Sequence, residues 1–352
     1  MAALVGCAKE RQTRLVKPRT PEHLVGKLAT VTEIAVIIPA FNNAPHLDLA
    51  LASVAGQTTP PSAVVVADDC SVDDTVQRAR RWEAHLPLEV IRLTRNWGPG
   101  LARHHAIQAT KVPLLAMLDA DDFILPDHLE TMAATYAARP GLISARELSW
   151  HPGHGLAAQA SPKGTYRASR RLAPLLRRNF VNFGFFSRDQ YESVGGFGEG
   201  QAEDWDLWIR MVRAGAALSM ASHATAVHRV RPDSLSSDVP VRLGDGIRVL
   251  TEALQAAYSP GEAAAARAGL RTLRGKLGFY RAMELVAEGR LRPARQVALS
   301  ALPASGPRAT AGLLALAAAP ATAARLERLT RRYRIPMQGE TSADEAQAPG
   351  RH

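Results

Sequence analysis

From Glu33 onward, short apolar runs alternate with segments of helical spacing. Four runs have the length and apolar content of strands, at residues 34–39, 63–67, 88–93 and 112–118. Three segments between them have helical spacing, at residues 45–57, 75–83 and 101–110. Strands that alternate with helices in this way predict an α/β sandwich with a mainly parallel, Rossmann-like sheet.

Three carboxylates directly follow the last of these strands, at Asp119, Asp121 and Asp122. Along an extended chain, Asp119 and Asp121 point to one side and Asp122 to the other. Two carboxylates that face one spot repel each other unless a cation lies between them. Mg²⁺ or Mn²⁺, bound also to phosphate oxygens, is the natural occupant. A turn or helix-capping role is the alternative that the triplet by itself leaves open.

A second acidic pair, Asp68 and Asp69, follows the strand at residues 63–67. Ligands of α/β sheets bind outside the carboxyl ends of the strands. The two acidic groups are therefore predicted to share one crevice.

Composition narrows the class of protein and its partners. The chain has 352 residues, 46% of them apolar, and two cysteines, which are too few for a disulfide framework and fit a reducing cytoplasm. No uncharged apolar run has the length of a membrane-spanning helix. The formal net charge of +10 indicates an anionic partner. Charge alone does not choose among a phosphorylated substrate, an anionic membrane and nucleic acid.

Shifts in composition predict the domain organisation. Residues 1–32 are basic and are predicted to form a loosely ordered extension, ahead of a domain at residues 33–240. Within that domain, we expect two halves, at residues 33–125 and 126–240. Residues 241–336 are rich in Ala, Leu and Arg with helical spacing, as at 263–290 and 309–334, and residues 337–352 form a polar, disordered tail. The basic helices fit a solvated face, an anionic lipid surface, contact with another chain, or a cover over the domain at residues 33–240.

Six motifs occur in order along residues 33–240. They are Ile34–Phe41, Asp68-Asp69-x-Ser-x-Asp-Asp-Thr, Gly98–Arg103, Leu-Asp-Ala-Asp-Asp with Pro126-Asp127, Gly195-Gly196-Phe197 and Glu203–Arg210. Together these motifs resemble the inverting family 2 glycosyltransferases. The resemblance implies a GT-A fold for residues 33–240, with residues 33–125 as the nucleotide-binding half and 126–240 as the acceptor half, and a nucleotide-diphosphate sugar as donor. The C-terminal α-helical appendix is predicted from the helical spacing beyond Pro240.

The resemblance also implies roles for the nucleotide-side residues. Pro39 and Phe41 would edge the base pocket, and Asp69 would accept a hydrogen bond from the uracil N–H. Asp68 would support the turn, although simple capping stays open for it. Arg103, one helical turn after the glycine-rich break, would reach the diphosphate.

For the catalytic side, the resemblance implies that Asp121 holds the metal and that Asp119 contacts the ribose, or the metal through water. His228 would complete the metal site, with ordinary packing as its alternative. Glu203 is placed among the nucleotide-sugar-binding residues, and Asp204 aligns with the catalytic base. One departure is His104-His105, where the family often has Asn after the arginine.

The sequence therefore predicts a metal-dependent inverting glycosyltransferase, cytoplasmic or peripheral at the inner face of the membrane. Its donor would be a UDP-sugar, and its acceptor a hydroxyl of a glycan or lipid-linked sugar. A nucleotidyltransferase and a non-catalytic sugar-nucleotide-binding scaffold are the alternatives. A nucleotidyltransferase usually has a glycine-rich loop where this chain has Pro39-Ala40-Phe41-Asn42. A non-catalytic scaffold would be expected to lack Asp121 or Asp204. Nucleic acid is not expected as a partner, because the basic helices lack interleaved aromatic residues.

Overall fold

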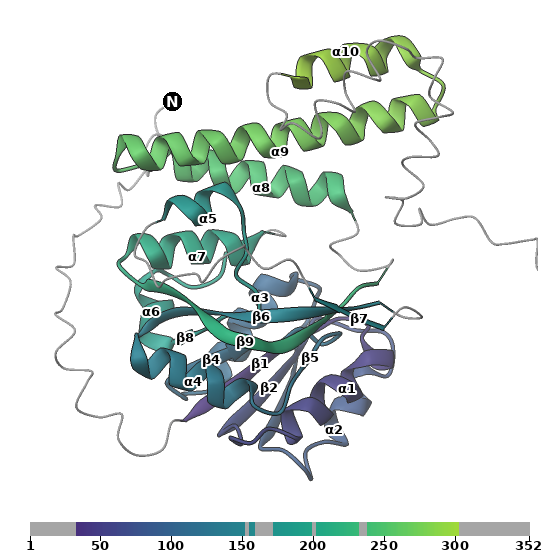
Figure 1. Cartoon of the computed structure of the whole chain (residues 1–352). Coiled ribbons are helices and arrows are strands. Elements are labelled where there is room, and N and C mark those ends of the chain that lie inside the picture. The colour runs from purple at the N-terminus through teal and green to yellow at the C-terminus, as the bar shows by residue number, and fades with distance from the viewer. Residues whose placement is uncertain (1–32, 152–154, 159–171, 199–201, 232–237, 303–352) are drawn as a thin grey trace, which may run out of the picture. The chain divides into compact units, whose positions relative to one another are not determined.

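The chain divides into two units, Met1–Thr32 and Glu33–His352. The structure, a computed structural model, describes residues 33–151, 155–158, 172–198, 202–231 and 238–302 (Figure 1). The predictions of a loose extension at residues 1–32, a helix at 309–334 and a disordered tail at 337–352 lie outside the described residues.

The first half of the fold is a parallel sheet with helical crossovers. Its strands are β1 (Ile34–Ala40), β2 (Ala63–Asp68), β3 (Leu88–Arg92) and β4 (Leu114–Met117), in the spatial order β3-β2-β1-β4. The helices between them are α1 (Ala44–Ala55), α2 (Thr75–Arg80) and α3 (Pro99–Ala109). Each of these elements lies where the sequence predicted it, and α2 ends three residues earlier than predicted.

The second half extends the sheet with strands of both directions. It contains β5 (Phe123–Ile124), α4 (His128–Ala138), β6 (Gly141–His151), β7 (Gly155–Ala158), β8 (Phe185–Ser187) and β9 (Ala217–Arg229). Strand β8 lies antiparallel between β4 and β6, and β9 pairs parallel with β6 and antiparallel with β5. The α/β class is confirmed, with the parallel sheet of the prediction confined largely to β1–β4 and a mixed sheet beyond it.

The phenylalanine-rich segment at residues 179–187 predicts a further strand, and the acidic triplet is predicted to lie on an extended chain. Both predictions are wrong in detail. The strand predicted at residues 179–187 is reduced to β8, because Phe183 has a φ of 47° and Gly184 is pressed against the ring of Trp208. Strand β4 ends at Met117, so the alternation of an extended chain does not continue through the acidic triplet.

The hydrophobic core forms two layers, one on each face of the sheet. Along β1, Ala35 and Ile37 face the layer that contains α3 and α7 (Glu203–Arg213), and Val36 and Ile38 face the layer that contains α1 and α4. All four side chains are fully buried. This explains why the strand is apolar at every position rather than at alternate ones.

Helices cover the acceptor half and continue beyond it. They are α5 (Ala173–Arg177), α6 (Arg188–Ser193), α8 (Val239–Gln255), α9 (Pro260–Ala287) and α10 (Leu291–Ala301). Helices α8 and α9 lie over α5 and α7 (Figure 1), with Leu250 and Leu270 in the same core layer as Trp205. The predicted C-terminal helical region is therefore present. Among the described helices, none has the length and apolar character needed to cross a membrane.

Candidate active site

The three carboxylates in the loop after β4 contact three different partners. Asp119 Oδ1 lies 2.5 Å from a guanidinium nitrogen of Arg103, and Asp121 Oδ2 lies 3.0 Å from Arg231. Asp122 is buried and accepts the backbone N–H of Arg229 at 2.8 Å. Each acid therefore faces a different segment of the chain, in place of the predicted alternation.

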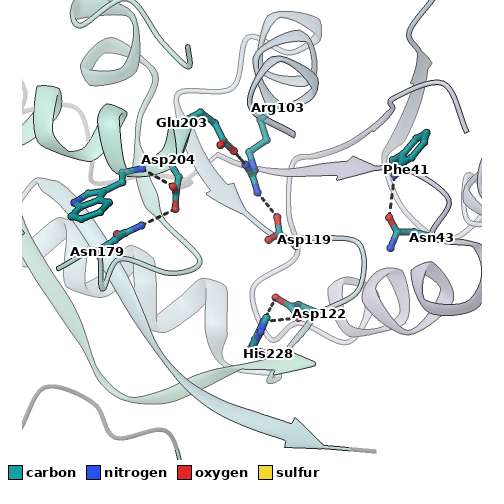
Figure 2. A network of polar contacts seen from close by, with 10 residues as sticks. Phe41, Asn43, Arg103, Asp119, Asp122, Asn179, Glu203, Asp204 and His228 are labelled. Atoms are coloured by element: carbon teal, nitrogen blue, oxygen red, sulfur yellow. Dashed lines mark hydrogen bonds and ion pairs between the residues drawn. The ribbon is translucent and has the colours of Figure 1, made fainter. Parts of the chain in front are cut away.

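Arg103, on α3, joins the acidic loop to the start of α7. Its two terminal nitrogens contact Glu203 at 2.6 Å and Asp119 at 2.5 Å (Figure 2). Only 11% of this side chain is exposed, and the two carboxylates raise its pKa against the opposing effect of burial. The arginine therefore stays charged, and it fixes two acids that are far apart in the sequence.

Glu203 is almost fully buried beneath Arg103. Its second oxygen, Oε2, has no hydrogen-bond partner among the described residues. Burial raises the pKa of Glu203 to about 7, although Arg103 opposes this shift. A Cβ on Gly100 would collide with the Glu203 side chain, so α3 approaches α7 this closely only because residue 100 is a glycine.

Asp204 lies next to Glu203 in the first turn of α7. Its Oδ2 accepts a hydrogen bond from Asn179 Nδ2 at 3.1 Å, and its Oδ1 accepts the Trp205 N–H at 2.6 Å (Figure 2). Burial raises the pKa of Asp204, while Arg103 opposes the shift. A raised pKa brings a carboxylate closer to the working range of a general base.

His228, on β9, pairs with Asp122 at 3.2 Å (Figure 2). This hydrogen bond raises the pKa of His228 to about 9, and burial raises the pKa of Asp122 to about 6. Asp122 therefore engages Nδ1 of His228 in this structure, and the role of His228 as a metal ligand stays a prediction.

The acidic loop fits a divalent cation that is shared with a ligand. Burial raises the pKa of Asp121, and repulsion from Asp119 raises it further. Among the described residues, no group of three or more His, Cys, Asp or Glu side chains has the arrangement of a metal site. Mg²⁺ is usually held by one or two carboxylates together with substrate phosphates. Asp119 and Asp121 match that donor set.

At the carboxyl end of β2, the two carboxylates Asp68 and Asp69 are held by backbone groups. Asp69 accepts the N–H groups of Trp97 and Gly98, both at 2.8 Å, and is 3% exposed. Asp68 is fully buried and accepts the Ser71 N–H at 3.2 Å. Asp68 thus holds its own turn, and Asp69 holds the turn that starts α3, which the sequence did not predict.

The two residues predicted to edge the base pocket, Pro39 and Phe41, differ in their exposure to solvent. Pro39 is buried within β1, whereas Phe41, just beyond the strand, has 45% of its surface exposed. The Phe41 N–H donates to Asn43 Oδ1 at 3.0 Å, which fixes the backbone at this point (Figure 2). Phe41 is therefore the residue of the pair that presents a free aromatic face.

Sequence reasoning missed several contributors. Asn179 contacts Asp204, Arg231 contacts Asp121, and Asn182 donates to Glu147 at 2.9 Å. No local pattern in the sequence pairs these residues with their partners, which lie 25 to 110 residues away along the chain. Trp205 and Trp208 are both core residues, at 6% and 3% exposure, and do not form a sugar platform.

The sequence of this chain is similar to those of known proteins. Residues 35–185 match the family model described as Glycosyl transferase family 2. The succinoglycan biosynthesis protein ExoU of Rhizobium meliloti is 30% identical over 233 residues, which cover 59% of this chain and 65% of ExoU. Glycosyltransferase AglE of Haloferax volcanii is 29% identical over 227 residues, covering 62% of this chain and 74% of AglE. Residues 35–185 of this chain are thus similar to the family 2 glycosyltransferases.

Solved structures agree on the fold. Staphylococcus aureus TarS 1–349 in complex with UDP-GlcNAc superposes with a TM-score of 0.59 at 20% identity, covering 86% of this chain and 92% of that one. The mannosyltransferase PcManGT of Pyrobaculum calidifontis, in complex with GDP-Man and Mn²⁺, gives 0.57 at 20% identity, covering 87% and 85%. These confirm the GT-A fold. The chain spans just under two thirds of ExoU, so shared activity with that relative is a proposal rather than a finding.

Proposed function

We propose that this protein is a metal-dependent inverting glycosyltransferase. It would move a sugar from a nucleotide-diphosphate donor to a hydroxyl of a glycan or lipid-linked acceptor, as in polysaccharide biosynthesis. The observation that carries the proposal is the Arg103 bridge, because it holds the acidic loop and the start of α7 against each other. A donor-binding group and a candidate base then face one crevice.

In the proposed reaction, Asp204 accepts the proton of the acceptor hydroxyl. The hydroxyl oxygen forms a bond to the anomeric carbon, and the bond from that carbon to the diphosphate oxygen breaks, with its electron pair leaving on the diphosphate. Because the attack comes opposite the leaving group, the configuration inverts. Asn179, which donates to Asp204 Oδ2, orients the carboxylate for this proton transfer.

The developing charge on the diphosphate needs positive groups around it. Mg²⁺ or Mn²⁺, held by Asp121 and Asp119 when bound, would supply electrophilic stabilisation of the leaving group. Arg231 and the charged His228 lie at the same loop, through Asp121 and Asp122 respectively. They would add fixed positive charge beside the phosphates.

A uridine donor is the specific form of this proposal. Phe41 offers an exposed face beside β1, and each Asp69 oxygen has a further lone pair for a uracil N–H. The two solved relatives bind different nucleotides, UDP-GlcNAc and GDP-Man, and so do not decide between uridine and guanosine.

The decisive experiment is a thermal-shift screen of UDP-, GDP- and ADP-sugars, each with and without Mn²⁺. Stabilisation by a UDP-sugar that requires metal is the expected result, followed by slow donor hydrolysis. Asp121→Asn should abolish the metal requirement and weaken binding, because a neutral amide does not offset the cation. Stabilisation by GDP- or ADP-sugars alone would reject the uridine assignment. If no donor stabilises the protein, the proposal that it is a glycosyltransferase is rejected.

We further propose peripheral contact with an anionic membrane at the cytoplasmic face, through one stripe of α9. Four exposed arginines, Arg267, Arg271, Arg274 and Arg281, are spaced by four, three and seven residues and therefore share one helix face. Basic residues near an anionic surface each contribute about 1 kcal/mol, which salt screens. Changing all four to Gln should abolish flotation on anionic vesicles, and flotation that survives 0.5 M salt (on the order of a 4 Å Debye length) would contradict the stripe.

A further inference from the structure

Helix α5 lies between the candidate base and the pair of helices α8 and α9. It packs against α9 on one side and against α7 on the other (Figure 1). Two residues after its last residue, Arg177, the chain reaches Asn179, whose side chain donates a hydrogen bond to Asp204 at 3.1 Å. The position of this short helix therefore determines whether Asn179 reaches the Asp204 carboxylate.

Helix α9 contacts the backbone of α5 at a glycine. A Cβ on Gly269 would collide with the carbonyl oxygen of Leu176 and would lie 2.7 Å from the Leu250 side chain of α8. The oxygen would have to move by roughly 1 Å to reach an ordinary carbon–oxygen contact of about 3.3 Å. Leu176 is fully buried and lies three residues before Asn179, so the same movement would displace Asn179.

The other side of α5 is held by Trp205, the neighbour of Asp204 on α7. The Trp205 indole N–H donates to the carbonyl oxygen of Leu175 at 2.9 Å, and its backbone N–H donates to Asp204 Oδ1 at 2.6 Å. A Cβ on Gly246 of α8 would lie 3.0 Å from the Trp205 ring. Because this ring is buried, a side chain at position 246 would press on it and shift the first turn of α7.

Two hydrogen bonds fix the Asp204 carboxylate, one at each oxygen, and each is supported from the C-terminal helices. Asn179, which donates to Oδ2, follows the segment that contacts Gly269. The N–H of Trp205, which donates to Oδ1, belongs to the residue whose ring contacts Gly246. Glycine in the middle of a helix is less stable than alanine, so close approach is what both positions require of it. A carboxylate fixed through both oxygens has a defined orientation, which proton transfer requires.

We propose that α8 and α9 position the candidate base Asp204 for its reaction. Gly269 does so through the last turn of α5 and Asn179, and Gly246 does so through the ring of Trp205. Both glycines are positioning residues, because they act on Asp204 only through other residues. This inference rests on the proposed transferase function, since it concerns how the base of that reaction is held. The two helices then belong to the catalytic unit, in addition to the membrane contact proposed for α9.

The test compares Gly269→Ala and Gly246→Ala with the control Gly244→Ala in the full-length chain. Position 244 also lies on α8, and a Cβ there meets no heavy atom of the described residues within 4 Å. The probe is the UDP-, GDP- or ADP-sugar that stabilises the wild type most with Mn²⁺. Its hydrolysis is measured, because water then takes the place of the acceptor hydroxyl.

At saturating donor, Gly269→Ala should lower the hydrolysis rate about ten- to a hundredfold, because a misplacement near 1 Å has an effect of this order. Gly246→Ala should lower the rate by a smaller factor, and Gly244→Ala should match the wild type. The Kd of the donor, measured by calorimetry, should stay near the wild-type value in all three variants, which a general loss of structure would not allow.

A double-mutant cycle tests the route through Asn179. In the Asn179→Ala background, Gly269→Ala should lower the rate much less than it does in the wild type, because two changes that act on one contact are not additive. Urea unfolding checks that each variant is folded under the assay conditions.

Hydrolysis by Gly269→Ala and Gly246→Ala at the rate of Gly244→Ala would overturn this inference and leave the transferase proposal intact. Equal fold-losses from Gly269→Ala with and without Asn179 would also overturn it. If Gly269→Ala does not fold, Gly246→Ala decides, because its contact at 3.0 Å requires the ring to give by only a few tenths of an ångström. If the wild type neither binds nor hydrolyses any nucleotide sugar, the transferase proposal itself fails, and this inference fails with it.

Discussion

The two halves of the candidate site hold their carboxylates in different ways. In the nucleotide half, Asp69 accepts two backbone N–H groups, from Trp97 and Gly98. Around Arg103, where the two halves meet, Asp119 and Glu203 are held by one guanidinium, and Asp204 by the side chain of Asn179 together with the Trp205 N–H. Backbone partners are fixed by the fold itself, whereas side-chain partners can rotate away.

This difference separates a rigid region from an exchangeable one. A carboxylate bound to backbone amides keeps its place whether or not a ligand is present. A carboxylate paired with an arginine can release it to a phosphate, because phosphate and carboxylate offer the guanidinium similar geometry. The carboxylates held by backbone groups thus keep fixed positions, whereas those paired with Arg103 can exchange partners.

The largest expected effect is on turnover, and comes from Asp204→Asn. A positioned base contributes about 10²–10⁴-fold, and the amide does not accept the proton. Donor and metal binding should stay near wild type, because the proton moves only when the acceptor reacts. The measurements are turnover at saturating acceptor and calorimetric binding of the donor.

Asp206→Asn is the matched control for this variant, since Asp206 lies in the same first turn and pairs with Arg210 rather than with the site. Near-normal turnover of Asp204→Asn would show that Asp204 only stabilises the start of α7. Glu203, with a pKa of about 7, would then be the next candidate for the base.

The next largest effect is on stability, and it tests the carboxylate that is held by backbone groups. Asp69→Asn should lower the free energy of unfolding by about 1.5–3 kcal/mol, because one of the two buried backbone N–H groups then faces an amide donor. Urea unfolding measures this. Asp74→Asn, exposed and without a capping hydrogen bond, should change stability by less than about 0.5 kcal/mol. Equal losses of unfolding free energy in the two variants would show that the backbone hydrogen bonds of Asp69 contribute no more to stability than an exposed aspartate does.

A third effect concerns pH and the buried His128 of α4, which is 1% exposed and bonded to Thr225. Burial lowers the pKa of His128 to about 4, so its neutral form stabilises the fold above the unfolded pKa near 6.5. This stability is lost as the pH falls from about 6.5 towards 4. Relative to His128→Gln, the wild type should lose roughly 2 kcal/mol between pH 7 and pH 5. A parallel pH dependence of the two unfolding free energies would contradict a neutral, buried histidine.

The smallest stability effect is expected for Asp119→Asn. This side chain is 48% exposed, so its pairing with Arg103 should contribute only about 0–1 kcal/mol to the free energy of unfolding. Metal-dependent donor binding should weaken nevertheless. If Asp119→Asn destabilises the protein as much as Asp69→Asn, the arginine-paired carboxylates are held as firmly as the one bound to backbone groups.

The parallel part of the fold followed from the sequence, because β1, β2 and β4 are continuous apolar runs buried on both faces. The acceptor half was less predictable. Strand β6 changes register with β9 between Ser144 and Glu147, and such irregularity leaves no clean period in the sequence. The short β8 is hidden in a phenylalanine-rich segment whose backbone turns at Phe183.

For the site, motifs identified the acids and not their partners. Asp119, Asp121, Glu203 and Asp204 stood out because they end a strand or open a helix. Their partners Asn179 and Arg231 carry no local signal, since a pairing over 25 or 110 residues is set by how the whole sheet closes. The role of Asp69 in holding the Trp97–Gly98 turn could not be predicted either, because these residues lie 28 and 29 positions from Asp69 in the sequence.

The Arg103 bridge also has a consequence for how the chain is made. During synthesis, α3 leaves the ribosome a hundred residues before Glu203, and domains acquire structure from the N-terminus onward. Until α7 emerges, Arg103 is a cation facing the Asp119 loop with one of its two partners missing. The nascent nucleotide half therefore has an open apolar face and an incomplete charge pair, and it is the stage of biogenesis at which a chaperone would be needed most.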